Sequence, residues 1–549
     1  MQVVTRTNGQ WALGEHTPLN SNEQFKLDDD GLNVRARIEQ VYSRKGFASI
    51  DPSDLRGRMR WWGLYTQRKE GIDGGRTATL EPEELDAEFF MMRVRVDGGA
   101  LTTEQLRVIA DISVEFARNT ADLTDRQNIQ YHWIRIEDVP EIWRRLEAVG
   151  LSTTEACGDC PRVVLGSPVA GVSADEVIDA TPAIDEITRR FIGDPTLSNL
   201  PRKFKTSVAW LPDCAPEIND LSFVGVEHPT LGYGFDVLVG GGLSTNPRLA
   251  ERLGVFVTLE QVPDVWHAVV QVFRDYGYRR LRNKARLKFL MADWGPQKFR
   301  EVLETEYLKQ PLPDGPAAAI GGTTLDHIGV HRQQDGRSYI GFAPIAGRVS
   351  GVTLAEVADA AEQAGSHRVR LTPYQKLLVL DVSDDAVQPL TERLSHVGLQ
   401  SDPSPWRRSV MACTGLEFCK LAIVETKARA HTLVAELERR LADIELDTPL
   451  SIHLNGCPNS CARIQVADIG LKGQIVTDGE GRQVEGYQVR LGGRLGQDAE
   501  FGRKVRALKV TADDLGDYVE RVTRTYVDTR SPGEPFAQWA VRVDESALQ

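Results

Sequence analysis

The 549-residue sequence lacks an apolar run long enough to cross a bilayer, and its N-terminus lacks a basic region followed by an apolar one. The first absence argues against a membrane protein and the second against a secreted one. We therefore expect a cytoplasmic protein, in which thiols stay reduced. There is no excess of positive charge either. The formal net charge of −13 argues against general nucleic-acid binding and favours small molecules or proteins as partners.

The sequence also has no GxGxxG motif opening a strand–helix unit, and GGGLS at residues 240–244 lacks the context of that fingerprint. A built-in nicotinamide site is therefore not expected, and no flavin module is evident. Redox chemistry in this chain would need an external one-electron donor.

Cysteine is scarce, and its seven copies are unevenly placed. An odd number in a large reduced chain does not describe a disulfide framework. Four of the seven form two close pairs, Cys413 with Cys419 in CTGLEFC and Cys457 with Cys461 in NGCPNSC. Four thiolates suit either zinc or an iron–sulfur cluster, although five intervening residues are unusual for a zinc knuckle. Buried free cysteines are the remaining alternative.

A strand, turn and helix pattern occurs twice. FFMMRVRV at 89–96 and the second half of LTDRQNIQYHWIRI are typical of strands, and Thr102 or Thr103 is expected to cap the helix between them. SYIGFAPIAGRVSG, VTLAEVADAAEQAG and LTPYQKLLVLDV repeat the pattern, and the two Leu-Thr pairs, at 123 and 371, are separated by 248 positions. The chain is therefore predicted to be duplicated, with two halves related by a pseudo-twofold.

The duplication places LPRKFKTSV opposite SIHLNGCPN. In this alignment Lys203 and Lys205 correspond to His453 and Asn455, and Arg162 corresponds roughly to Cys413. The first half thus has cations where the second has thiols, which favours a site between the halves.

The thiol motifs, together with RMRWWGLYTQRKEG, FMMRVRVDGG, LTDRQNIQYHW, LPRKFKTSV and GFDVLVGGGLS, closely resemble those of the sulfite and nitrite reductase family that uses sirohaem. The resemblance extends from about residue 45 to the C-terminus. It implies that Cys413, Cys419, Cys457 and Cys461 hold a [4Fe–4S] cluster. It also implies that Cys461 bridges to the sirohaem iron as its axial ligand.

Cations are expected on the opposite side of that cofactor. Lys203 and Lys205 would share one face of a strand, since side chains alternate, but an arbitrary KxK is more commonly a solvated face. The resemblance implies that Arg93, Arg162, Lys203 and Lys205 bind the substrate anion and help to bring protons to departing oxygens. It further implies cofactor contacts for Arg126, Gln130, His132 and Asn459, although an isolated buried histidine more often has a structural role.

Two further features stay open at this point. The basic run RDYGYRRLRNKARLK at 274–288 suits a solvated helix face, counterions for sirohaem carboxylates, or a dock for an acidic donor. Tyr65 and Cys157 lie in family motifs, and some similar sulfite reductases have a Tyr–Cys thioether. We therefore expect a Tyr65–Cys157 link, with a free buried thiol as the alternative.

The substrate is expected to be sulfite. LPRKFKT resembles the sulfite-reducing version of the motif, because nitrite enzymes of the family tend to have asparagine where this chain has Lys205. We predict an assimilatory sulfite reductase that reduces sulfite to sulfide with six electrons from ferredoxin. The alternatives are a ferredoxin-dependent nitrite reductase, which makes ammonia, and a non-catalytic zinc- or cluster-bearing binding protein. A monomer that binds neither nucleic acid nor membrane is expected.

The predicted fold is α+β, with paired ferredoxin-like half-units and two α/β lobes around the sirohaem. The expected divisions are an N-terminal segment at 1–79 that wraps the second half, half-units at 80–150 and 326–405, a cation-bearing lobe at 151–325 and a cysteine-bearing lobe at 406–549.

Overall fold

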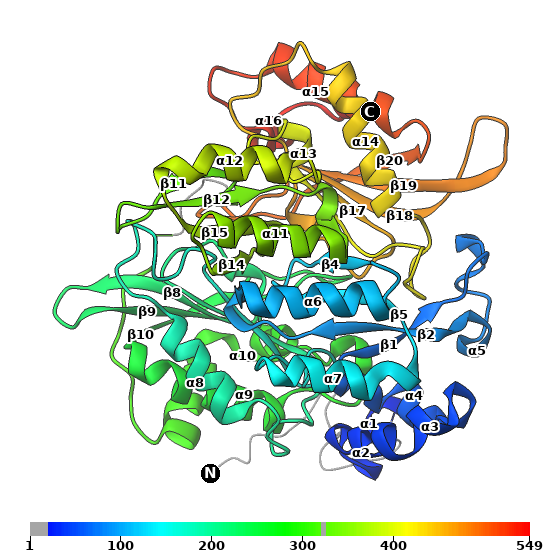
Figure 1. The fold of residues 1–549 in the computed structure, drawn as a ribbon. Coiled ribbons are helices and arrows are strands. Elements are labelled where there is room, and N and C mark those ends of the chain that lie inside the picture. Colours follow the sequence, from blue (N-terminus) through cyan, green and yellow to red (C-terminus); the bar gives the residue numbers. More distant parts are fainter. Residues whose placement is uncertain (1–19, 320–325) are drawn as a thin grey trace.

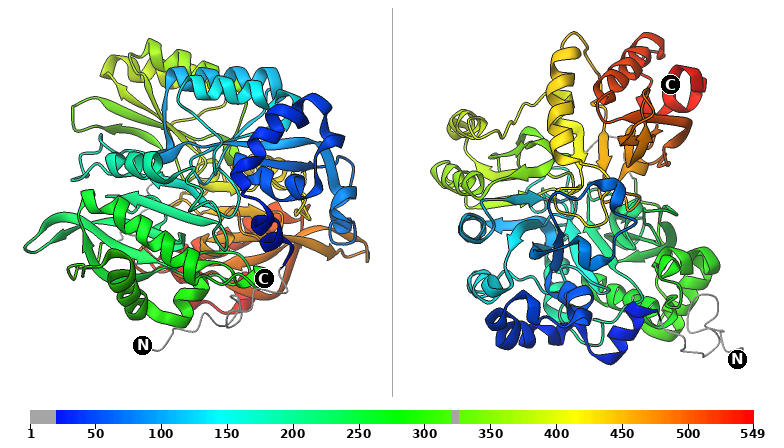
Figure 2. Two further views of the ribbon diagram at one scale, coloured as in Figure 1. Left: turned by 90° about the horizontal axis from the view of Figure 1, so that it is seen from below. Right: turned by 90° about the vertical axis from the view of Figure 1, so that its right-hand side faces the viewer.

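The computed structural model describes residues 20–319 and 326–549. Within them the chain forms four five-stranded sheets with helices packed on their faces, so the predicted α+β class is confirmed (Figure 1). Two sheets belong to the half-units and two to the lobes. The second lobe lies at the opposite end of the molecule from the N-terminal helices (Figure 2).

The first half-unit sheet has the order β1-β2-β5-β4-β13. Its strands are β1 (Leu64–Arg68), β2 (Asp86–Val94), β5 (Ile129–Ile134), β4 (Ala121–Leu123) and β13 (Arg348–Val349). Helix α6 (Thr103–Phe116) follows strand β3 (Ala100–Thr102), and helix α7 (Val139–Ala148) follows β5. The predicted cap is Thr102, which exchanges hydrogen bonds with Gln105 in a capping box.

The second half-unit sheet repeats this plan with the order β11-β12-β15-β14-β3. Its strands are β11 (Gly329–Arg332), β12 (Ser338–Phe342), β15 (Leu377–Val382), β14 (Arg368–Leu371) and β3 (Ala100–Thr102). Helix α11 (Gly351–Gln363) packs against α6 and α12 (Asp384–Ser395), so that α7, α6, α11 and α12 form one layer (Figure 1).

The half-units exchange one strand each. β3 comes from the first half but pairs with β14, with Leu101 opposite Val369. β13 comes from the second half but pairs with β4, where Arg348 also bonds Asp122 at 2.7 Å. A single hydrophobic core extends across both sheets. The pseudo-twofold pair is therefore interlocked through backbone hydrogen bonds rather than merely packed.

The two lobes share a second plan, in which three parallel strands are followed by two antiparallel ones. In the first lobe these are β6 (Pro161–Gly166), β7 (Phe204–Ala209), β8 (Leu221–His228), β9 (Gly232–Val239) and β10 (Glu251–Val257). Helices α8 (Thr181–Phe191), α9 (Val262–Tyr276) and α10 (Leu287–Val302) share their core.

In the second lobe the strands are β16 (Val410–Ala412), β17 (Ile452–Asn455), β18 (Ile469–Thr477), β19 (Gln483–Leu491) and β20 (Arg503–Thr511). They are accompanied by α13 (Pro405–Ser409), α14 (Lys427–Arg440), α15 (Leu515–Thr529) and α16 (Phe536–Arg542). The duplication predicted from sequence thus extends to both pairs of sheets.

The exact correspondence between the lobes differs from the one expected. The side chain of Gln127 pairs with the backbone of Gly166 at the end of β6, and Gln375 pairs in the same way with Ala412 at the end of β16. Cys413 therefore corresponds to Ser167, and the expected match with Arg162 is wrong.

The lysines are also out of register. The backbone N–H of Lys205 donates to Asp220 at 2.8 Å, as that of Ser451 does to Asp468 at 2.9 Å. Lys205 thus corresponds to Ser451, so the expected alignment of the lysines with His453 and Asn455 is wrong. The loops of the two lobes differ in length, so a constant sequence offset between the halves does not align equivalent residues of their strands.

The N-terminal helices α1 (Ser21–Asp28), α2 (Val34–Arg37), α3 (Ser43–Lys45) and α4 (Pro52–Arg56) pack on the first half. Lys26 of α1 pairs with Glu23 and Asp159 and donates to Leu200 O. The expectation that the N-terminal segment wraps the second half is therefore wrong for these helices. In the described part of this segment, β1 and the chain between it and the short helix α5 (Pro82–Leu85) contact the second lobe: Arg68 N–H donates to Phe418 O, and Thr77 donates to Ala422 O.

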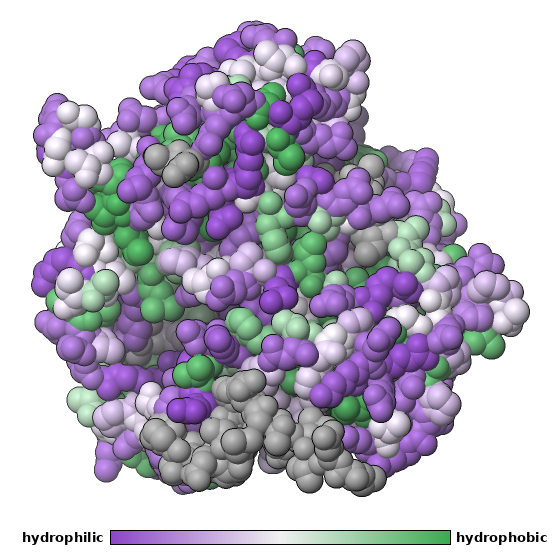
Figure 3. Space-filling view, turned by 180° about the vertical axis from the view of Figure 1, so that it is seen from behind, coloured by the Kyte–Doolittle hydropathy of each residue, from purple (hydrophilic) through white to green (hydrophobic). Residues whose placement is uncertain are grey.

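The molecular surface is mixed. On the face shown in Figure 3, hydrophilic residues predominate and hydrophobic ones are interspersed among them. Among the described helices, none combines the length and apolar character needed to cross a membrane.

Candidate active site

The two cysteine pairs follow neighbouring parallel strands. Cys413 comes directly after β16, and Cys457 lies two residues beyond the end of β17. Since β16 and β17 are parallel and adjacent, their carboxyl ends meet at one edge of the sheet. The backbone N–H of Gly456 donates to the Cys413 thiol at 3.2 Å, which joins the two loops directly.

The four thiols influence one another. Burial, followed by the neighbouring Cys461, raises the pKa of Cys413 to about 12. Burial also raises the pKa of Cys419 and of Cys457, with Cys461 again contributing. Backbone N–H groups of Leu421 and Asn459 oppose these rises, because a hydrogen bond to sulfur favours the thiolate.

This donor set fits an iron–sulfur cluster. Thiolates with backbone hydrogen bonds to the sulfurs are the ligands that such clusters use. Within residues 20–319 and 326–549, no three His, Cys, Asp or Glu side chains converge on a point suited to a single metal ion. The four thiols are therefore proposed to hold a cluster together, and not a single metal ion.

Asn455 and Arg463 hold the second cysteine loop, a role that was not predicted for either residue. The Asn455 amide donates to Cys457 O at 3.0 Å and accepts from the Ala462 N–H at 2.7 Å. Arg463 has a positive φ of 59° and donates to Asp125 O in the first half at 2.7 Å. Both flank the predicted ligands, which is the only signal the sequence offers for them.

Three of the four predicted substrate cations stand in the first lobe, where strands β6 and β7 begin. Lys203 precedes β7, and Lys205 and Arg162 are the second residues of β7 and β6. Arg162 donates twice to Gly158 O, at 2.9 and 2.7 Å. Arg93 in β2 has a buried Nε without a hydrogen-bond partner. The site thus combines the amino edge of one lobe sheet with the carboxyl edge of the other.

Repulsion among these cations is incompletely balanced by the protein. Burial, followed by the charges of Arg286 and Arg162, lowers the pKa of Lys203 to about 7, and Cys461 opposes the change. Burial, Arg126 and Lys203 bring the pKa of Lys205 well below its usual range. Crowded, partly desolvated cations of this kind favour binding of an anion. Cys461 is thus within electrostatic range of Lys203.

Tyr65 and Cys157 also lie together. Burial raises the pKa of Tyr65, and Cys157 is the next contributor, followed by the opposing charges of Arg162, Arg60 and Arg93. Cys157 is fully buried. The structure therefore brings both residues beside two of the predicted substrate cations.

The residues predicted to contact the cofactor have different surroundings. Arg126 is buried and donates to Asn219 at 2.6 Å and to Val163 O at 2.9 Å. Gln130 lies opposite Arg93 in the β2–β5 pair. His132 is fully buried; it contacts Asp122 at 3.2 Å and stacks on Phe418 of the first cysteine loop at 3.8 Å. Asn459 is exposed in the second loop. Cofactor contacts of these four residues stay predictions.

The basic run at 274–288 is largely paired inside the protein. Arg282 bonds Asp159, Arg286 bonds Asp220 at 2.7 Å, and the Lys288 ammonium donates to Leu243 O at 2.8 Å. These residues therefore stabilise the first lobe through internal ion pairs and hydrogen bonds, whereas Arg280 and Lys284 are exposed.

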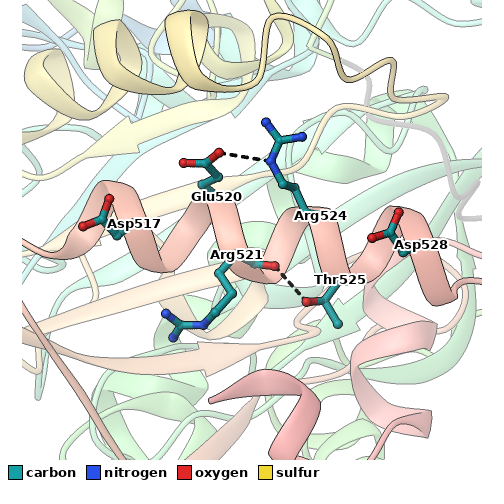
Figure 4. A pocket seen from close by; sticks show the side chains of 6 residues that line it. All are labelled: Asp517, Glu520, Arg521, Arg524, Thr525 and Asp528. Carbon is teal, nitrogen blue, oxygen red and sulfur yellow. Dashed lines mark hydrogen bonds and ion pairs between the residues drawn. The ribbon is translucent and has the colours of Figure 1, made fainter.

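A surface hollow elsewhere has no link to this site. It is lined by Asp517, Glu520, Arg521, Arg524, Thr525 and Asp528, all from α15 (Figure 4). Arg524 pairs there with Glu520 at 3.0 Å. None of the predicted site residues lines it.

Comparisons with known proteins agree with this arrangement. The family model described as "Nitrite and sulphite reductase 4Fe-4S domain" matches residues 157–312 and 405–545. The model described as "Nitrite/Sulfite reductase ferredoxin-like half domain" matches residues 83–149 and 331–397. Together they match well over half of the chain.

Curated relatives match over nearly the whole length. "Sulfite reductase [ferredoxin] 2" of Mycolicibacterium paratuberculosis is 63% identical over 99% of this chain and 98% of that protein. "Assimilatory ferredoxin-dependent nitrite reductase" of Haloferax mediterranei is 35% identical over 94% and 90%. The solved structure titled "Structure of Mycobacterium tuberculosis NirA protein" is 61% identical, covers 99% of this chain and 100% of its own, and superposes with a TM-score of 0.96.

Proposed function

This chain belongs to the nitrite and sulfite reductase family, and from that premise we propose that it is a ferredoxin-dependent assimilatory sulfite reductase. It is thus an oxidoreductase that uses sirohaem and a [4Fe–4S] cluster to reduce sulfite to sulfide. Relatives named sulfite reductase are far more similar than those named nitrite reductase, at 61–63% against 35–36% identity. Nitrite reduction is therefore the weaker alternative, and a non-catalytic binding protein is set aside.

The observation that carries this proposal is the proximity of the Cys461 thiol to crowded cations whose charges are only partly balanced by carboxylates. Cys461 lies close enough to Lys203 for its charge to affect the pKa of the ammonium. An anion that takes up several electrons and protons needs an electron source and positive donors at one point. A purely structural metal site needs no such cations.

We propose that Cys413, Cys419, Cys457 and Cys461 would hold the cluster, and that Cys461 would also hold the sirohaem through its iron. When bound, sirohaem coupled to the cluster supplies electrons one at a time to the substrate. The thiol donor set and its backbone hydrogen bonds support this assignment. Arg126, Gln130, His132 and Asn459 are proposed as nearby cofactor-positioning residues.

The chain's own part in the reaction is binding and proton supply. Arg93 and Arg162 are proposed to bind sulfite oxygens, since guanidinium groups keep their charge and offer several fixed donors. Lys203 and Lys205 are proposed to bind further oxygens and to release protons, because an ammonium whose pKa is lowered by burial and neighbouring cations gives up a proton more readily.

Compartment, oligomeric state, donor binding and domain boundaries are part of the same proposal. We expect the enzyme to act as a cytoplasmic monomer, with reduced ferredoxin bound weakly through complementary charge. The predicted divisions at residues 79/80, 150/151, 325/326 and 405/406 remain part of the proposal.

Purified holoprotein is expected to reduce sulfite with a higher kcat/KM than nitrite when reduced ferredoxin supplies the electrons. The reason is that four crowded cations suit an anion with more charge and three oxygens. Steady-state turnover of both anions would measure this, with sirohaem-free protein as the control. A large preference for nitrite would contradict the proposed substrate.

Tyr65 and Cys157 are expected to be joined by a thioether. The charge of Cys157 acts on the Tyr65 phenol, and Cys157 is fully buried, which supports the proposal. The link would form with loss of one hydrogen from the phenol ring and one from the thiol, and an oxidant such as dioxygen would take up the two electrons. Peptide mass spectrometry of active enzyme should find one cross-linked species lighter by two hydrogens than the separate peptides, and Cys157→Ser should lack it. Finding both residues unmodified in active enzyme would exclude the link.

A further inference from the structure

A buried arginine that the proposed mechanism does not use lies against the first cysteine loop. Arg68, the last residue of β1, is 2% exposed. Its backbone N–H donates to Phe418 O at 2.9 Å, and its Nη1 lies 3.4 Å from Ala422 O. These contacts fall on both sides of Cys419, one of the proposed cluster ligands.

The chain after Arg68 closes over this loop, and we call residues 68–79 the strap. The Arg68 guanidinium donates to Thr77 Oγ1 at 3.0 Å and to Ile72 O and Asp73 O, both at 3.1 Å. Thr77 donates in turn to Ala422 O at 2.8 Å. At Gly74 an added Cβ would lie 1.8 Å from Ile423 O, so the strap has no room for a side chain there. The guanidinium is thereby held away from water.

The charge of Arg68 is uncompensated at close range. Within the described part of the chain, its hydrogen-bond acceptors are one hydroxyl and three backbone carbonyls, all neutral, and its Nε has no partner. Asp73 and Glu485 act on it only at longer range, after Cys419. Lys427 provides a contrast: it lies near Cys413, but Asp122 approaches it at 3.6 Å.

We propose that Arg68 is a positioning residue that fixes the Cys419 loop and raises the reduction potential of the [4Fe–4S] cluster. The inference rests on the proposed function, because it requires the cluster at these thiols. One-electron reduction adds a negative charge to the cluster. A nearby positive charge in a site of low polarity stabilises that reduced form, as charge and hydrogen bonding around the sulfurs set cluster potentials.

The test is a redox titration of holoenzyme followed by electron paramagnetic resonance, comparing wild type with Arg68→Met and Arg68→Lys. Arg68→Met is expected to disfavour the reduced cluster roughly tenfold or more, and a tenfold change is about 59 mV for one electron. Arg68→Lys keeps the charge and should retain most of the wild-type potential. Arg76→Gln, an exposed cation in the same strap, is the matched control and should leave the potential unchanged.

Three outcomes would overturn the inference. One is a wild-type potential in Arg68→Met, and another is an equal fall in the Met and Lys variants, since that would exclude charge as the cause. If Arg68→Met does not retain iron, Arg68→Gln, whose side chain keeps two amide N–H donors, replaces it in the titration. The third outcome is loss of the cluster from both variants, which would mean that Arg68 has a purely structural role. A wild-type protein without any cluster would instead overturn the proposed function, so the two failures are distinguishable.

Discussion

Cys461→Ser is expected to lower sulfite turnover roughly a thousandfold or more, equivalent to about 4 kcal/mol of activation free energy. The proposed role of this thiolate is to join the cluster to the sirohaem iron, and serine is a poor replacement for a bridging sulfur. Residue 461 is exposed in the chain itself, so the substitution disturbs little packing. Turnover with reduced ferredoxin and the visible spectrum of the purified protein would measure the effect.

Cys214→Ser provides the control for this change. Cys214 is also a free cysteine, but it is buried in the first lobe, where its thiol contacts Asp213 at 3.4 Å, an interaction that a hydroxyl can replace. It should keep both the spectrum and the turnover. If Cys461→Ser retained a wild-type spectrum and substantial turnover, the bridging role would be excluded.

Lys205→Asn is expected to lower kcat/KM for sulfite roughly 100-fold, by analogy with removal of one preorganised donor. The loss for nitrite should be clearly smaller. Sulfite carries more charge at neutral pH and has three oxygens to protonate, whereas nitrite has one charge and two oxygens. Lys205 is crowded by Arg126 and Lys203, with Asp125 the main opposing charge, so its removal takes away an anion-binding group.

Parallel assays of the two anions would measure the discrimination. Lys69→Asn removes an exposed lysine outside the site and should change neither value. Equal losses for sulfite and nitrite in Lys205→Asn would mean that this residue does not select between them.

The sequence predicted the duplicated fold because both half-units carry the same local signals. Gly99 and Gly347 have positive φ values of 69° and 70°, and at each an added Cβ would meet a carbonyl of the other half-unit. Such turns require glycine and are visible in the sequence. The register of the lobe strands could not be predicted from the sequence offset between the halves. Loop length determines which residue begins each strand, and no local sequence signal fixes loop length.

The residues of the candidate site that lie in recognisable motifs could be predicted from the sequence. The cysteines and cations lie inside motifs of unusual spacing and composition. Arg463 lies outside the quoted motifs, and Arg68 lies inside RMRWWGLYTQRKEG but nothing there distinguishes it from its neighbours. The roles of both arise from contacts with segments that are far away in sequence. Arg463 meets Asp125 across the halves, and Arg68 meets the loop around Cys419. Only the folded chain brings these partners together.

The exchange of β3 and β13 has a consequence for how this protein can be divided. If each product of the duplicated gene had kept its own edge strand, the two would be separable pieces that fold alone. Here either piece, expressed by itself, would have an unpaired sheet edge and one strand, β3 or β13, without its pairing partner. A split gene for this enzyme would therefore work only if both fragments were made together, and the ancestral single-repeat protein would have had to pair with a second copy of itself.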